Sequence, residues 1–192
     1  IDDEMLIDDW HRSGSSFHEA MPELEAEREY RIVVALCRRG LGASIKASLL
    51  LMDWPAVEKA DAVIACMGFN PKIEGEALDR TFELPENQRH FMDKLLETNS
   101  KTLLVATAGG ALDVAPWIDR IPAFLHQWYS GQDGGQAVAD ILTGTVNPSG
   151  KLPISFARNL KDYPGQQDYP GRALTVRYNE GIFVGYRYFD SN

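Results

Sequence analysis

The chain has 192 residues, of which 44% are hydrophobic and 24% are charged, and its formal net charge is −9 at pH 7. This length suits one or two domains with a sizeable core. The negative charge argues against nucleic acid or an anionic membrane as a partner, because both are bound through basic patches. No apolar run approaches the ~20 residues that cross a bilayer as a helix.

Residues 1–54 have the sequence pattern of β-structure. Short apolar runs occur at MLID and at Tyr30–Arg38, and a third covers residues 43–54. In the third run polar residues alternate with apolar ones at Ser44–Ser48, which is typical of a half-buried strand. We therefore expect β-strands in this part, followed by a short helix that begins near Pro55.

From Asp61 the pattern changes to strands alternating with helices, which predicts an α/β domain with a largely parallel sheet. A buried strand is expected at Ala62–Met67, and a helix begins at Pro85, a favoured first position. We expect strands at 101–110 and 121–129, a helix around 112–118 and another at 136–144, a strand within 147–156, a loop at 162–172 and a strand-like tail at 181–189.

A polar loop follows the first of these strands and is the strongest candidate for a functional site. It holds Glu74, Glu76, Asp79 and Arg80 within seven positions. In open α/β sheets ligands bind outside the carboxyl ends of the strands. The alternative is a loop whose charges are only solvated, which is common for charged segments.

The cysteines and histidines give no sign of a metal or cofactor site. Cys37 and Cys66 lie in apolar, strand-like runs and are expected to be buried free thiols. His126 lies in a predicted strand and is expected to be a core histidine with its hydrogen bonds satisfied. None of the histidines has the spacing of metal ligands; they are His11, His18, His90 and His126.

The glycine pairs also have a structural explanation. Gly109–Gly110 and Gly134–Gly135 end strands or begin helices, as phosphate-binding loops do, but neither fits a phosphate-binding motif. Close packing of the backbone is therefore the favoured interpretation. A nucleotide-binding α/β domain remains a disfavoured alternative.

Three stretches of the α/β part, taken together, resemble one known family. IEGEALDRTFELPENQ resembles the acid/base loop of glycoside hydrolase family 3, the β-glucosidases and β-xylosidases. WYSGQDGGQAVADILTGTVNPSGKLPISF and YNEGIFVGYRYFD resemble two later runs of the same family. The three occur in the family's order between Asp61 and Asp190.

The resemblance implies the domain organisation and the activity. Residues 55–192 would be most of the family's α/β sandwich domain. Residues 1–54 would be the end of a protective-antigen-like insert, which is an antiparallel β-sandwich. The whole protein would be a retaining, exo-acting β-glucosidase acting on oligosaccharides or aryl β-glycosides, without a cofactor. Its nucleophilic aspartate would lie in a (β/α)8 barrel outside this chain. The family suggests a periplasmic or secreted protein, with the cytoplasm as an alternative.

The family's motif also assigns the acid/base. In E-G-x-D-R the glutamate stands three residues before the aspartate, which is the spacing of Glu76 to Asp79, whereas Glu74 stands five before it. Glu76 is therefore the expected acid/base, and Glu74 is the alternative. Asp79 and Arg80 are expected to organise the loop. Glu180 is interpreted as a surface or bracing carboxylate.

Two alternative functions stay open at this point. One is a β-xylosidase of the same family. The other is a carbohydrate-binding module without catalysis, because nothing in this chain resembles the barrel's nucleophile motif.

Overall fold

The computed structural model describes residues 52–171 and 173–191. The chain divides into two compact units, Ile1–Trp54 and Pro55–Asn192. Three predictions lie outside the described residues: the strands expected in residues 1–51, the buried thiol of Cys37 and the insert assigned to residues 1–54. Of that insert, the structure describes the last three positions. All three stay predictions, and the sheet belongs to the second unit.

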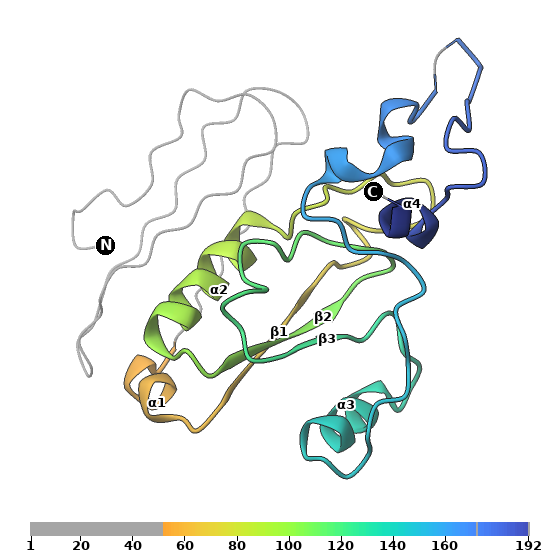
Figure 1. Cartoon of the computed structure of the whole chain (residues 1–192). Helices are drawn as coiled ribbons and strands as arrows, with labels where there is room; N and C mark the ends of the chain where they lie inside the picture. The colour runs from red at the N-terminus through yellow and green to blue at the C-terminus, as the bar shows by residue number, and fades with distance from the viewer. Residues whose placement is uncertain (1–51, 172, 192) are drawn as a thin grey trace, which may run out of the picture. The chain divides into compact units, whose positions relative to one another are not determined.

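The sheet of this unit has three parallel strands in the order β1-β2-β3. They are β1 (Val63–Gly68), β2 (Thr102–Thr107) and β3 (Phe124–His126) (Figure 1). Strand β2 lies in the middle and pairs with β1 over its whole length, while the short β3 pairs with residues 104–106. The predicted parallel α/β arrangement is therefore confirmed.

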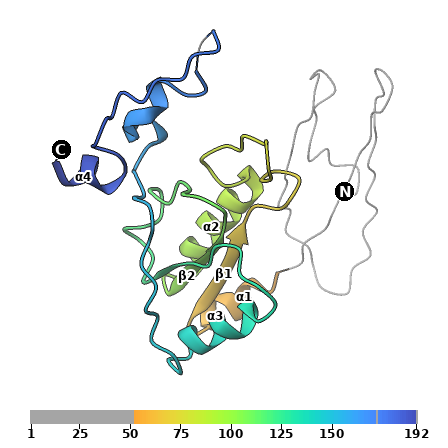
Figure 2. The same ribbon diagram turned by 90° about the vertical axis from the view of Figure 1, so that its right-hand side faces the viewer.

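Helix α2 (Glu86–Thr98) connects β1 to β2 and runs alongside the sheet (Figures 1 and 2). It begins at Glu86, one residue after the predicted start, because Pro85 is the N-cap residue, and it buries Met92, Leu95 and Leu96. Its C-cap residue, Asn99, donates two side-chain hydrogen bonds to carbonyls at the end of α1 (Trp54–Lys59), at 2.8 and 2.9 Å. The two helices are thereby joined at one end of the sheet.

The core lies around α2, β2 and the segment that follows β2. Its largest fully buried apolar side chains lie between residues 84 and 117: Trp117, Leu84, Met92, Leu104, Leu112 and Val105. The indole of Trp117 donates to the Oδ1 atom of Asp93 at 2.8 Å, so its polar edge is satisfied. Each such side chain stabilises the fold by roughly 1.5–3 kcal/mol through burial.

One face of β1 is exposed, which corrects the prediction of a fully buried strand. Successive side chains of a strand point to opposite faces. Ala65 and Met67 are buried, whereas Ile64 is 50% exposed and Cys66 is exposed. Cys66 is a free thiol as expected, but the prediction that it is buried is wrong, because the described residues leave that face of the edge strand open.

Two predicted elements are replaced by turns or irregular chain. Residues 115–120 form consecutive turns in place of a helix, because Pro116 has no N–H to donate to a helical ladder. Residues 147–156 form no strand; Pro148 and Pro153 interrupt the pattern, and proline is excluded from the interior of sheets. The strand predicted at 121–129 is confirmed only over the three residues of β3.

The C-terminal part is more helical than its sequence pattern indicates. Helix α3 (Gly134–Leu142) forms as expected and ends before Gly144, whose φ is +78°. The expected loop at 162–172 contains a short 3-10 helix, η2 (Pro164–Gln167), and begins at the last residue of another, η1 (Leu160–Asp162). The tail expected to be a strand forms helix α4 (Tyr186–Ser191), because left-handed glycines at 181 and 185, with φ of +58° and +60°, interrupt an extended chain.

Candidate active site

Three loops meet at one edge of the sheet, because parallel strands all end on the same side. They follow β1, β2 and β3, respectively. The loop after β1 turns first at Asn70, whose carbonyl accepts hydrogen bonds from the amides of Ile73 and Glu74 at 2.9 and 3.0 Å. It turns again at its tip, where Gly75 and Leu78 form an isolated bridge. Glu76 and Ala77 lie between them at the apex.

Glu74 joins all three loops through its carboxylate. Its Oε1 atom accepts from Nε of Arg80 at 2.6 Å. Its Oε2 atom accepts from the amide of Gly109 at 3.0 Å and from the hydroxyl of Tyr129. These partners come from the loops after β1, β2 and β3, so one side chain links loops that are far apart in the sequence.

Arg80 also makes several contacts. Besides Glu74, its guanidinium donates to the carbonyls of Thr81 at 2.9 Å and Ala111 at 2.8 Å. Its Cζ atom lies 4.3 Å from the centroid of the Phe69 ring, a distance at which a cation is attracted to an aromatic face. These contacts connect Arg80 to the loop after β2, and its role as an organiser of the acidic loop stays a prediction.

These contacts set the charge states of the linked groups. Burial by itself would raise the pKa of Glu74, but hydrogen bonds from Arg80, Tyr129 and Gly109 outweigh it and lower that pKa. Desolvation and the hydrogen bond to Glu74 raise the pKa of the Tyr129 phenol. The pair is therefore a carboxylate acceptor and a phenol donor near neutrality.

Glu76 and Asp79 lie in a different environment from Glu74. Both are exposed. Asp79 accepts a hydrogen bond from the hydroxyl of Tyr169 at 2.6 Å, and this bond raises the pKa of that phenol. Glu76 makes no hydrogen bond or ion pair with the described residues, so its carboxyl group is available at the tip of the loop.

His126 is half-buried at the end of β3, and its ring lies near that of Trp128, with centroids 4.1 Å apart and the ring planes tilted by 51°. Its Nε2 atom lies 3.3 Å from the carbonyl of Gly110, and its Nδ1 atom is buried without a partner among the described residues. Burial lowers the pKa of this imidazole. The expectation of a fully satisfied core histidine is therefore met at only one of the two ring nitrogens.

Close packing explains Gly109 and Gly134, one glycine of each pair, whereas a Cβ atom at Gly135 would meet nothing within 4 Å. A Cβ atom at Gly109 would lie 3.0 Å from Cε2 of Tyr129, and one at Gly134 would lie 2.0 Å from Oγ of Ser130. The described residues include no group of three or more His, Cys, Asp or Glu side chains that could hold a metal ion. The described chain also has no helix long and apolar enough to cross a membrane.

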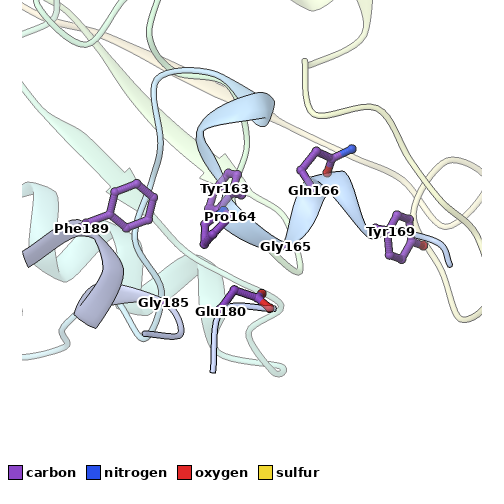
Figure 3. A pocket seen from close by; sticks show the side chains of 8 residues that line it. All are labelled: Tyr163, Pro164, Gly165, Gln166, Tyr169, Glu180, Gly185 and Phe189. Carbon is purple, nitrogen blue, oxygen red and sulfur yellow. The ribbon is translucent and has the colours of Figure 1, made fainter. Parts of the chain in front are cut away.

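A shallow pocket lies in the C-terminal part of the unit (Figure 3). Glu180 lies against Gly165 there, and a Cβ atom at that glycine would stand 2.6 Å from the Oε1 atom of Glu180. Aromatic rings make up much of the lining, which consists of Tyr163, Pro164, Gly165, Gln166, Tyr169, Glu180, Gly185 and Phe189. Tyr169 also contacts Asp79, so this part of the chain reaches the loop after β1.

Sequence reasoning missed Tyr129, Gly109 and Tyr169 as partners of the acidic loop. Tyr129 lies in the WYSG stretch that carries part of the family resemblance, and this was its only signal. Gly109 was interpreted as a packing glycine, which it is, but its amide also donates to Glu74.

An α/β domain with a carboxylate-bearing loop at the carboxyl edge of its sheet is typical of enzymes and ligand-binding proteins. The model of the glycosyl hydrolase family 3 C-terminal domain matches residues 39–186, and the chain belongs to this family. The family inferred from the three motifs is therefore confirmed.

The names of the individual relatives give more than one activity. The chain is 32% identical to a beta-glucosidase of Rhizobium radiobacter, over 100% of this chain and 27% of the relative. It is 39% identical to beta-glucosidase B of Emericella nidulans, over 69% of this chain and 17% of the relative. It is also 37% identical to an exo-alpha-(1->6)-L-arabinopyranosidase of Bifidobacterium breve, over 81% of this chain and 22% of the relative.

Solved structures of beta-glucosidases also match this chain. The GH3 beta-glucosidase of Bifidobacterium adolescentis matches with a TM-score of 0.67 and 36% identity, over 71% of this chain and 20% of that chain. The beta-glucosidase of Kluyveromyces marxianus in complex with glucose matches with a TM-score of 0.68 and 31% identity, over 74% of this chain and 18% of that chain. The chain thus spans roughly a fifth of the length of these solved proteins.

Proposed function

We propose that this chain supplies the general acid/base, Glu76, of a retaining, exo-acting β-glycosidase. The nucleophilic aspartate would lie in a (β/α)8 barrel of the same protein, outside this chain. The observation that carries the proposal is the contrast within one loop: Glu76 is exposed and unpaired among the described residues, whereas Glu74 is bound by three donors.

The chemistry favours the exposed carboxyl group. Retaining hydrolysis uses two carboxyl groups ~5–5.5 Å apart, one as nucleophile and one as acid and then base. The acid must give a proton to the leaving oxygen and later take one from water. The lowered pKa of Glu74 and its three bound donors make it a poor proton donor. Glu76 has no such contacts and can reach a substrate bound between this domain and another.

The backbone of the tip supports the same choice. Ala77 has a φ of +60°, a region that glycine occupies far more readily than other residues. The family pattern E-G-x-D-R carries glycine directly after its glutamate. If Glu76 corresponds to that glutamate, Ala77 occupies the glycine position, and its left-handed backbone is accounted for.

Asp79 and Arg80 act as organisers in this proposal. Arg80 bridges the base of the tip to Ala111, and Asp79 accepts from Tyr169. Neither contact requires a sugar. Both limit the movement of the segment that carries Glu76.

The proposed substrate is a terminal β-linked sugar, with glucose as the first choice because several relatives are named beta-glucosidases. The arabinopyranosidase relative favours testing other sugars too. A panel of aryl glycosides, including β-glucoside, β-xyloside and α-L-arabinopyranoside, would rank these with the full-length protein. Turnover of none of them would favour the carbohydrate-binding module.

The role of Glu76 is tested by leaving-group dependence. In the full-length protein Glu76→Ala should slow substrates with poor leaving groups by ~10²–10⁴-fold, because general acid catalysis contributes that much. Activated aryl glycosides should lose much less at the glycosylation step. Glu83→Gln is the matched control, an exposed carboxylate later in the same segment. A leaving-group-dependent loss in Glu74→Ala but not in Glu76→Ala would reverse the assignment.

A further inference from the structure

The carboxylate of Glu74 is the meeting point of three loops, and no role in the reaction has been assigned to it. Its donors lie 6, 35 and 55 residues away in the sequence, at Arg80, Gly109 and Tyr129. Tyr129 also reaches both other loops, because its hydroxyl donates to Glu74 and its ring lies beside Gly109.

We propose that Glu74 is a positioning residue, which with Tyr129 fixes the loop so that Glu76 stands in its working place. The inference rests on the proposed function for Glu76. It adds a specific requirement, namely that a charged acceptor at position 74 and a phenol donor at position 129 are both needed.

Geometry supports this role. Glu74 and Arg80 stand at the two ends of the tip that carries Glu76, and they are joined to each other at 2.6 Å. From these two points, hydrogen bonds run outward to Gly109 and Ala111 in the loop after β2. The tip is therefore closed at its base and anchored to the neighbouring loop on both sides.

The chemistry of the acceptor explains why a charge is needed. An ionised carboxylate only accepts hydrogen bonds, whereas a side-chain amide has one accepting oxygen and one donating nitrogen. At Glu74 both oxygens face N–H or O–H donors. In Glu74→Gln the amide nitrogen would face Arg80 in one orientation, or Gly109 and Tyr129 in the other. A substitution of nearly equal size thus breaks the link.

The role is separable from folding. Glu74 and Tyr129 lie outside the apolar core, and Tyr129 is 56% exposed. Tyr129→Phe removes one hydroxyl from an exposed ring. It should leave the sheet intact, which makes it the second variant if Glu74→Gln proves hard to produce.

The first measurement is amide hydrogen exchange on the 192-residue chain, followed by NMR. Glu74→Gln should make the Gly109 amide exchange at least several-fold faster, because that N–H donates to Glu74. Tyr129→Phe should also make the Gly109 amide exchange faster, but by a smaller factor. Glu83→Gln should change nothing there. Unchanged exchange at Gly109 in both Glu74→Gln and Tyr129→Phe would overturn the inference, whatever Glu76 does.

The second measurement is kinetic and uses the full-length protein. Glu74→Gln should lower kcat by about 10- to 100-fold, since a misplacement of ~1 Å can cost that much. The loss should be larger for poor leaving groups than for activated ones, as expected when the acid is misplaced. Azide should restore nothing, because Glu76 is still present. Tyr129→Phe should lower kcat by a smaller factor, again more for poor leaving groups than for activated ones.

The two proposals fail in distinguishable ways. If Glu76→Ala shows leaving-group dependence while Glu74→Gln keeps its kcat, the positioning role is wrong and the acid/base stands. If Glu76→Ala shows no such dependence but Gly109 exchange responds to Glu74→Gln, the link between the loops exists and the assignment of the acid is wrong. The claim that Glu74 positions the acid then fails with it.

Discussion

The segment from β1 to α3 and the segment after Gly144 differ in how they use their apolar residues. The first contains nearly all the described core, including Leu104 and Trp117, which are 0% and 1% exposed. In the described chain after Trp117, Ala157 is the one apolar residue that is buried. Large side chains of the later segment face outward, for example Leu174 at 108%, Tyr178 at 83% and Ile182 at 74% exposure.

The candidate site is held in place by polar contacts rather than by the apolar core. The acidic loop belongs to the segment with a core, but its own contacts are polar: a carboxylate, a guanidinium, a phenol and backbone groups. The later segment reaches the loop through the hydrogen bond from Tyr169 to Asp79. We therefore expect stability to depend on the first segment and the shape of the loop to depend on the polar links.

The largest effect should come from the core. Leu104→Ala should lower the free energy of unfolding by ~2–5 kcal/mol, because it leaves a cavity beside fully buried neighbours. Ile182→Ala in the later segment should cost at most ~0.5 kcal/mol, as exposed positions do. Urea unfolding of the chain measures both. Equal losses would show that the contrast between the two segments does not exist.

Gly109→Ala tests the close contact between the loops. The new Cβ would lie 3.0 Å from Cε2 of Tyr129 and 3.4 Å from the Oε1 atom of Glu74. Overpacking of this kind costs ~1–3 kcal/mol. Gly150→Ala is the matched control, since a Cβ there would meet nothing within 4 Å. Urea unfolding should separate the two variants, and a Gly109→Ala variant as stable as its control would argue against close packing.

The pH dependence of stability should report Glu74. Its pKa is lower in the folded chain than in the unfolded one, so the ionised form stabilises the fold. That stabilisation is present above the unfolded pKa of ~4.3 and is lost as the pH falls through the lower folded pKa. Glu74→Gln should cost ~1–2 kcal/mol at neutral pH, allowing for solvent screening. Thermal unfolding at pH 7 and pH 3 should show the gap between variant and wild type narrowing at the lower pH.

The smallest effect concerns the tip. Ala77→Gly should raise the free energy of unfolding by up to ~1 kcal/mol, because the left-handed backbone disfavours a Cβ. Ala173, with a φ of +48°, offers a comparison outside the loop. If Ala77→Gly destabilises the chain, the left-handed conformation at the tip is contradicted.

The sequence predicted the sheet more accurately than the tail. Apolar patterns located β1, α2 and β2 because each of these elements has apolar side chains that are buried in the core. In residues 181–189 the same apolar pattern suggested a strand, but that segment has no described neighbouring strand to pair with, and two glycines turn the chain.

Within the site, spacing distinguished Glu76 from Glu74, but it could not identify their environments. The partners Gly109 and Tyr129 lie 35 and 55 residues from Glu74. Only the parallel order of the strands brings them together, and a local pattern carries no information about which side chains meet across loops. The number of donors on each carboxylate therefore had to come from the structure.

The most direct test of the central claim, that Glu76 and not Glu74 is the acid/base, is azide rescue in the full-length protein. With an activated aryl β-glycoside, Glu76→Ala should accumulate the glycosyl-enzyme, and azide should enter the space left by the carboxyl group. We expect a β-glycosyl azide and faster turnover with Glu76→Ala, and neither with Glu74→Ala. A glycosyl azide formed by Glu74→Ala but not by Glu76→Ala would contradict it.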